Sequence, residues 1–207
     1  MREAIKLGLI LMLITGIAGL ALGFVYVNTK NLIKKNDTAK EMAALEKLVG
    51  HQFDPAKYEI ASNITLTNAK IYAVYKFGND YIIKFSGNGF GGEVLTVGKF
   101  AVLNKNVVEL QKFEVLDASQ ETPGLGEKIT KPDVIERFEG VEMKKGAQVL
   151  VNKDAGVLAE TQQGIDQNKK KGIVQTSDVM TGATITPRGV SAAITAVINW
   201  ILEKEER

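Results

Sequence analysis

The sequence has no cysteine and only one histidine, His51, among its 207 residues. The lack of cysteine excludes disulfide bonds, thiol catalysis and iron–sulfur ligation by this chain. A zinc site of the usual Cys/His type has no ligand set, and a Ser-His-Asp triad would have to use His51. His51 follows Gly50 at the end of an expected helix, so a helix-end histidine is the simpler interpretation. We therefore predict no metal site and no catalytic residue.

An excess of charge of one sign is missing as well. Lysine and arginine number 26 against 24 acidic residues, which gives a net charge of +2. A nucleic-acid partner would need a basic patch or stripe, whereas the lysines here are scattered. We predict no nucleic-acid partner. With 45% apolar and 24% charged residues, the composition is that of a globular protein.

One long uncharged segment is present, at residues 7–27. At 1.5 Å per residue it reaches roughly 30 Å, the thickness of a bilayer core. A cleaved signal peptide is the alternative, but the segment exceeds a usual h-region and no small-x-small site follows it cleanly. We predict a single-pass anchor in the cytoplasmic membrane, in contact with lipid, over residues 1–28. A membrane-proximal helix or linker follows over residues 29–50.

The remaining residues, 51–207, predict one α+β domain with a largely antiparallel sheet flanked by helices. Two β-hairpins are expected, because apolar and β-branched runs flank Gly/Asn-rich turns. Helices are expected before and after them, and Gly50 should end the first. The expected elements are helix 37–49, strands 69–77, 81–86, 93–103, 107–116 and 147–151, helix 133–138 begun by Pro132, a polar loop at 161–171 and a helix from Pro187 onward.

The most informative segment is Asp178-Val179-Met180-Thr181-Gly182-Ala183-Thr184-Ile185-Thr186-Pro187. Thr186 suits a helix N-cap and Pro187 the first helical position. A helix N-terminus favours a phosphate, because it presents free N–H groups and the positive end of the helix dipole. Thr184 would place a hydroxyl near such an anion. By these arguments alone, an ordinary capped helix after a small-residue turn is the preferred interpretation.

The run from Asp178 to Thr184 resembles the flavinylation motif of FMN-binding domains, in which an Asp precedes a Ser/Thr-Gly-Ala-Thr core. Two further runs resemble signatures of the same family and stand in the family's order. They are Gly89-Phe90-Gly91-Gly92-Glu93-Val94 and Glu121-Thr122-Pro123-Gly124-Leu125-Gly126-Glu127-Lys128-Ile129. One departure is that Asp117-Ala118-Ser119-Gln120 stands where family members often have a histidine.

The resemblance implies a cofactor, FMN, attached as a phosphoester to Thr184. It implies that a flavin transferase supplies the FMN from FAD and needs the motif's Asp178. The remaining expected contacts are Thr181, Gly182 and Ala183 in the motif and Glu121, Thr122, Gly124, Leu125 and Gly126 in the loop packed along the ring. Lys128 is a candidate charge near the phosphate, although an exposed lysine is the simpler interpretation.

The family includes RnfG, a component of the Rnf complex, and NqrC, a component of the Na⁺-translocating NADH:quinone reductase. By resemblance, the chain is an electron relay that works with other membrane and redox subunits of an Rnf-type complex, which exchanges electrons between ferredoxin and NAD and moves ions. The domain would be extracytoplasmic. The charges flanking the anchor favour the opposite orientation by the positive-inside count, and we follow the resemblance.

Three alternatives stay open. The chain could be the quinone-reductase component, which the short length disfavours. It could be a stand-alone anchored flavin reductase, which the shortage of histidine and cysteine disfavours. It could also be a structural component with an unused flavin site, since Gly16, Gly19 and Gly23 suit contact with a partner helix.

Overall fold

The computed structural model describes residues 2–206. Met1 and Arg207, the outer ends of the predicted anchor and domain, lie outside the described residues. The chain divides into two compact units, the first ending at Met42 and the second beginning at Ala43.

Helix α1 (Arg2–Val49) is continuous over 48 residues, so the segment predicted as a separate helix at 37–49 is its C-terminal part. The predicted end is confirmed. Gly50 adopts a left-handed φ of 82°, and its N–H donates to the Glu46 carbonyl at 2.8 Å. A left-handed glycine satisfies the last carbonyls of a helix at no steric cost.

Two of the described helices are long and apolar enough to cross a membrane. They are α1 and the last helix, α6 (Ile185–Glu205). The apolar window of α6 is 61% buried inside the second unit, as in a core helix, whereas that of α1 is not buried at all. Helix α1 is therefore the candidate for a single membrane span. An N-terminal signal sequence would share its length and apolar composition.

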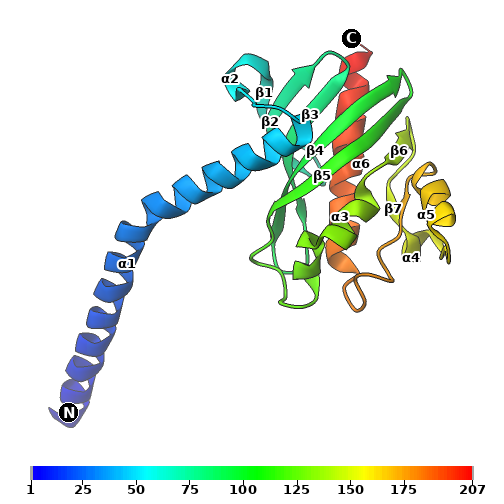
Figure 1. Cartoon of the computed structure of the whole chain (residues 1–207). Coiled ribbons are helices and arrows are strands. Elements are labelled where there is room, and N and C mark those ends of the chain that lie inside the picture. Colours follow the sequence, from blue (N-terminus) through cyan, green and yellow to red (C-terminus); the bar gives the residue numbers. More distant parts are fainter. Residues whose placement is uncertain (1, 207) are drawn as a thin grey trace. The chain divides into compact units, whose positions relative to one another are not determined.

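A six-stranded antiparallel sheet forms the centre of the second unit (Figure 1). Each strand pairs with the next along the chain, and both predicted hairpins are confirmed. The predicted fold class, an α+β domain with a largely antiparallel sheet flanked by helices, is confirmed by this mixed α/β unit. The strands are β1 (Glu59–Thr65), β2 (Lys70–Phe77), β3 (Asp80–Asn88), β4 (Glu93–Asn104), β5 (Val107–Asp117) and β6 (Val141–Lys144).

The core lies between this sheet and α6 (Figure 1). Residues spaced three and four apart on α6, including Val190, Ile194 and Val197, are fully buried. They meet the sheet face that carries Ile83 and Phe85, since alternate residues of a strand share one face. The predicted apolar face of the last helix is thereby confirmed.

Short elements complete the unit and hold the segment that leads into α6. They are α2 (Pro55–Tyr58), the 3₁₀ helix η1 (Gly126–Thr130), α3 (Pro132–Phe138), β7 (Leu150–Val151), α4 (Asn152–Ala155), α5 (Gln162–Lys169) and β8 (Ile173–Val174). Strands β7 and β8 pair in parallel. The helix begun by Pro132 is confirmed. Strand β7 is shorter than the predicted strand at 147–151.

The polar loop predicted at 161–171 is wrong. Most of it is α5, whose N-terminus is capped by the Thr161 hydroxyl accepting from the Gly164 N–H at 3.2 Å. The segment buries one apolar residue, Ile165. A helix that buries so little shows no apolar stripe in the sequence, so its pattern looks like that of a loop. Its N-cap stabilises it by satisfying a free N–H group.

The predicted start of the last helix is also wrong by two residues. Helix α6 begins at Ile185, with Thr184 as the preceding residue, so Thr186 and Pro187 lie inside its first turn. Thr186 is the second residue of the helix rather than its cap, and its hydroxyl donates to Glu121. Pro187 is tolerated there because the first four N–H groups of a helix have no intrahelical acceptor.

Candidate functional site

A cavity of about 270 Å³ lies at the N-terminal end of α6. Three stretches that are distant in the sequence line it: Phe90, the loop that follows β5, and the approach to α6. Its lining residues are Phe90, Glu121, Thr122, Leu125, Gly126, Gly182, Ala183, Thr184, Ile185 and Thr186.

Close backbone packing brings α6 to this place. A Cβ added at Gly189 would lie 1.7 Å from the Asn88 carbonyl oxygen at the end of β3. Only glycine allows this approach. The start of α6 is therefore fixed beside the turn between β3 and β4, which carries Phe90.

Glu121 links the same segments through hydrogen bonds. It is a buried carboxylate, with an exposed fraction of only 4%. Thr186 Oγ1 of α6 donates to its Oε2 at 2.7 Å, and the Gly91 N–H donates to its Oε1 at 3.2 Å. A Cβ on Gly126 would lie 1.9 Å from Oε2. Buried carboxylates are stable only when their oxygens accept hydrogen bonds, so Glu121 holds the cavity wall together.

Three apolar side chains stand exposed around the cavity. Phe90 is 68% exposed, Ile185 49% and Leu125 42%. Gly182 adopts a φ of 83°, and a Cβ there would lie 3.3 Å from Leu125 Cδ2. Apolar side chains with a few polar groups between them are typical of cofactor sites.

Thr184 is half-buried and presents its hydroxyl at the junction of the cavity and the first turn of α6. Lys153 Nζ donates to Thr184 Oγ1 at 3.2 Å. The N-terminus of α6 adds unpaired backbone N–H groups and the positive end of its dipole. A hydroxyl, an ammonium group and a helix N-terminus together suit a phosphate ester.

Seven of the ten residues predicted from the sequence line this one cavity. The three others are Asp178, Thr181 and Gly124, which all lie on the surface. Gly124 has a φ of 72°, which the turn requires. Glu121, Thr122, Leu125, Gly126, Gly182, Ala183 and Thr184 make up the seven.

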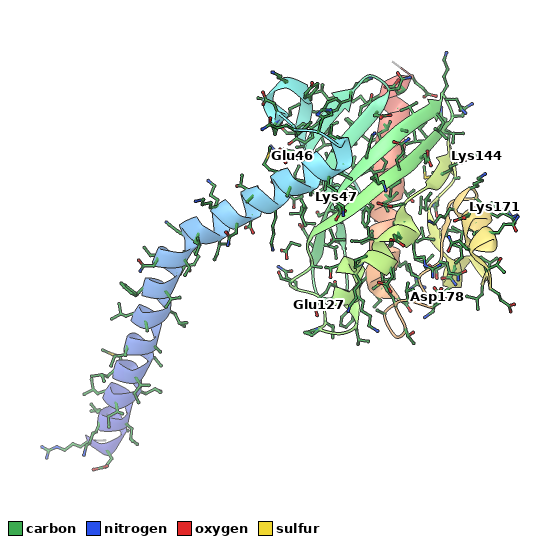
Figure 2. The ribbon with its side chains drawn as sticks, in the orientation of Figure 1. Glu46, Lys47, Glu127, Lys144, Lys171 and Asp178 are labelled. Atoms are coloured by element: carbon green, nitrogen blue, oxygen red, sulfur yellow. The ribbon has the colours of Figure 1, made fainter. Side chains whose placement is uncertain are left out.

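Asp178 makes contacts of its own in the segment between β8 and α6 (Figure 2). Its Oδ2 accepts from Arg137 NH2 at 2.8 Å and from Gln175 Nε2 at 3.2 Å. The carboxylate side chain keeps 35% exposure. It is therefore oriented by two partners and still open to solvent.

Sequence reasoning missed Lys153, Phe90, Ile185 and Thr186 as residues of the site. Phe90 stands within the glycine-rich run, so that run was the available signal for it. Ile185 and Thr186 directly follow Thr184. Lys153 is 31 residues away from Thr184, and nothing in its local sequence marks it. Lys128, the lysine considered from the sequence, does not line the cavity.

Comparison with known families adds a decisive observation. Residues 89–199, more than half of the chain, match the FMN-binding domain family. The chain belongs to the FMN-binding domain family. No curated protein matches it. The matched range of this FMN-binding domain begins beside Phe90 and includes every residue that lines the cavity.

The residues of the cavity fit FMN by their chemistry. Phe90, Leu125 and Ile185 offer apolar surface to a flat ring, and the start of α6 with Lys153 offers donors to a phosphate. Membership of the FMN-binding domain family supports FMN as the cofactor and a flavin-binding, electron-transfer role.

Proposed function

We propose that this chain carries FMN as a phosphoester on Thr184 and relays electrons as the RnfG-type component of a membrane-bound Rnf complex. The observation that supports the proposal most is the position of Thr184. Its hydroxyl lies where the cavity meets the start of α6, beside the Lys153 ammonium group. The quinone-reductase component of the same family, NqrC, is the related alternative.

Attachment of FMN to Thr184 is a group transfer from FAD. Thr184 Oγ attacks the phosphorus atom next to the riboflavin moiety, and a new O–P bond forms. The bond from that phosphorus to the bridging oxygen breaks, and AMP leaves with this oxygen. The hydroxyl proton is lost to a base of the flavin transferase. Asp178, the first residue of the motif, keeps 35% side-chain exposure, so the transferase can contact its carboxylate.

FMN, once attached, supplies the redox chemistry, and the protein sets its position and surroundings. Phe90, Leu125 and Ile185 would offer apolar surface to its ring. Glu121 keeps the loop at 121–126 against α6 through Thr186. The ester retains the cofactor without any need for binding affinity, which suits a domain separated from the cytoplasmic FMN pool.

The membrane assignment rests on α1 and on the family resemblance. The apolar window of α1 has a mean hydropathy of 2.4. We propose that this segment anchors the chain in the cytoplasmic membrane, that the FMN-binding domain is extracytoplasmic, and that neighbouring membrane and redox subunits give and take its electrons. A cysteine-labelling scan with a membrane-impermeant maleimide would test the orientation, because the natural chain has no cysteine.

Intact mass tests the covalent linkage directly. The full chain is co-expressed with a flavin transferase, purified in detergent and compared with its Thr184→Val variant. We expect the wild type to gain the mass of one FMN less one water and a fluorescent band after denaturation. Thr184→Val should gain neither. Thr122→Val changes another hydroxyl of the same cavity and should still be modified.

Two results would contradict the proposal. If the wild-type chain keeps its unmodified mass, FMN is not attached covalently. If peptide mapping finds the flavin on another residue, Thr184 is not the attachment site. Purification of the native complex then separates the alternatives. Ferredoxin-dependent NAD reduction indicates the Rnf type, NADH-dependent quinone reduction the other type, and turnover by the isolated chain a stand-alone reductase. Unchanged complex activity with Thr184→Val would indicate a structural component.

A further inference from the structure

Lys153 lies beside the proposed attachment point although it comes from a different element. It belongs to α4, and its Nζ is 3.2 Å from Thr184 Oγ1. The residues that line the cavity include one carboxylate, Glu121, and no basic side chain. Lys153 therefore brings the positive charge that the cavity wall itself lacks.

The backbone on one side of Lys153 is held by Asn152, which is buried to 2% exposure. Its Oδ1 accepts from the N–H groups of Thr176 and Ser177 at 3.1 and 3.2 Å. Its Nδ2 donates to Ser177 Oγ at 2.8 Å. These bonds tie α4 to the chain just before Asp178, where the approach to Thr184 begins.

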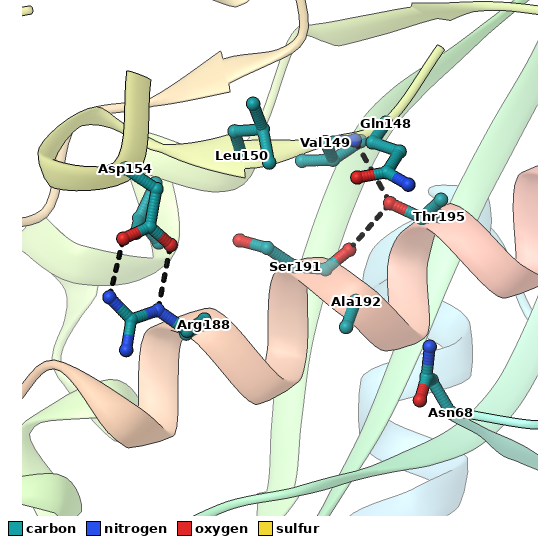
Figure 3. A pocket seen from close by; sticks show the side chains of 10 residues that line it. Asn68, Gln148, Val149, Leu150, Asp154, Arg188, Ser191, Ala192 and Thr195 are labelled. Carbon is teal, nitrogen blue, oxygen red and sulfur yellow. Dashed lines mark hydrogen bonds and ion pairs between the residues drawn. The ribbon is translucent and has the colours of Figure 1, made fainter. Parts of the chain in front are cut away.

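The other side of Lys153 is held by Asp154, which forms an ion pair with Arg188 in the first turns of α6 (Figure 3). Arg188 Nε donates to Asp154 Oδ2 at 2.7 Å, and a second bond joins NH2 to Oδ1. The hydrogen bonds from Arg188 lower the pKa of the Asp154 carboxyl. Both neighbours of Lys153 thus fix α4 to the two segments that flank Thr184.

We propose that Lys153 is the cation that binds the phosphoryl group joining FMN to Thr184. This inference rests on the proposed function. The phosphoester carries one negative charge, and it would stand near the buried Glu121 carboxylate. Arg188 already directs its Nε and NH2 groups to Asp154. An ammonium within hydrogen-bond distance of the ester oxygen would offset this charge in the product, and also the charge on the phosphoryl oxygens during transfer.

The test follows flavin attachment over time by intact mass. The full chain in detergent is mixed with FAD and a purified transferase. We expect Lys153→Gln to slow attachment by roughly tenfold, equivalent to about 1.4 kcal/mol. Lys153→Arg keeps the charge and should stay within about threefold of the wild type. The charge-matched control is Lys171→Gln, at an exposed position on the turn after α5 (Figure 2), with a rate equal to wild type.

A second readout separates phosphate binding from recognition by the transferase. Once each variant has been fully flavinylated by long incubation, the ³¹P chemical shift of the ester should move in Lys153→Gln and stay at the wild-type value in Lys171→Gln. Lys153 is exposed, so thermal unfolding followed by Trp200 fluorescence should match wild type in all three variants.

The outcomes distinguish this inference from the function on which it rests. A wild-type chain that takes no flavin overturns both. Normal flavin attachment in Lys153→Gln, or an unchanged ³¹P shift, overturns the role of Lys153 alone. Equal slowing in the Gln and Arg variants also overturns it, because the positive charge would then not be the cause.

Discussion

Among the single residues, Glu121 does most to hold the wall of the cavity together. It is buried, and each of its two carboxylate oxygens accepts one hydrogen bond, from the Thr186 hydroxyl and the Gly91 N–H. These bonds join the loop after β5 to α6 and to the turn after β3. In a low-dielectric setting, a charged acceptor that loses one donor costs more than an ordinary hydrogen bond.

Removing the Thr186 hydroxyl should therefore destabilise the domain. Thr186→Val keeps the side-chain shape but leaves Glu121 Oε2 without its donor. We expect the free energy of unfolding to fall by about 1.5–3 kcal/mol. Urea unfolding followed by the fluorescence of the single tryptophan, Trp200, which is 8% exposed, measures this. Thr186→Ser retains the hydroxyl, and a loss as large in that variant would contradict the explanation.

At the scale of elements, α6 matters most because it is held at both ends. Its first turns lie against β3 at Gly189, and its last turn carries Glu205. Lys76 Nζ donates to Glu205 Oε1 at 2.7 Å and to Tyr81 Oη at 2.8 Å, while Tyr81 Oη donates to Glu205. The position of Thr184 along the sheet follows from these two attachments.

Gly189→Ala sets helix propensity against packing. Within a helix, the change from glycine to alanine normally stabilises by about 1 kcal/mol. Here the new Cβ would lie 1.7 Å from the Asn88 carbonyl oxygen, so α6 would have to shift. We expect a loss of more than about 2 kcal/mol in the same urea measurement. A stabilised Gly189→Ala would refute the close packing.

The C-terminal attachment should depend on pH. The hydrogen bond from Lys76, followed by the one from Tyr81, lowers the pKa of Glu205 below its ordinary value of 4.5. A carboxyl with a lowered folded-state pKa stabilises the folded state above its unfolded pKa and loses this contribution as the pH falls through its folded pKa. We expect Glu205→Gln to lower the melting temperature at pH 7.

Below about pH 4.5, the difference between wild type and Glu205→Gln should shrink. Differential scanning fluorimetry at a series of pH values would show this. Glu203→Gln is a matched control, since Glu203 is exposed on the same helix. A difference that stays constant down to pH 2 would argue against the ion pair.

At the scale of the whole molecule, the second unit begins before the border predicted from the sequence. It starts at Ala43, whereas the FMN-binding domain was predicted from residue 51. The last turns of α1 place Leu45 and Leu48 in the buried set, at 1% and 5% exposure. Lys47 forms an ion pair with Glu114 on β5. These contacts place the end of α1 in the second unit, and the domain border at residue 51 stays a prediction.

Truncation tests this border. A chain that begins at Ala43 should unfold with the same urea midpoint as the full chain, whereas one that begins at His51 loses both leucines. Full burial of a leucine contributes about 1.5–3 kcal/mol, so the shorter chain should lose roughly 3–6 kcal/mol. Equal stability of the two truncated chains would favour a domain that begins at residue 51.

The sequence by itself determined those parts of the protein that depend on neighbours along the chain. Alternating apolar residues around Gly78 and around Asn104 gave the two hairpins, and the 3.6-residue spacing gave the buried face of α6. The resemblance of the motif before α6 to FMN-binding domains predicted FMN, which the family match supports, and attachment at Thr184, which stays a prediction. Such patterns are readable because hydrophobic periodicity and turn chemistry act over a few residues.

Only the tertiary structure decided the parts that depend on distant segments. Strand β1 is mostly exposed and shows no alternation, so its pairing with β2 came from the fold. Helix α6 begins two residues before the predicted start, and Thr186 inside it bonds to Glu121, 65 residues away. Lys153 reached Thr184 only because Asn152 and Asp154 fix α4 to two other segments. Contacts between distant residues leave no periodic trace, since packing of the whole chain creates them.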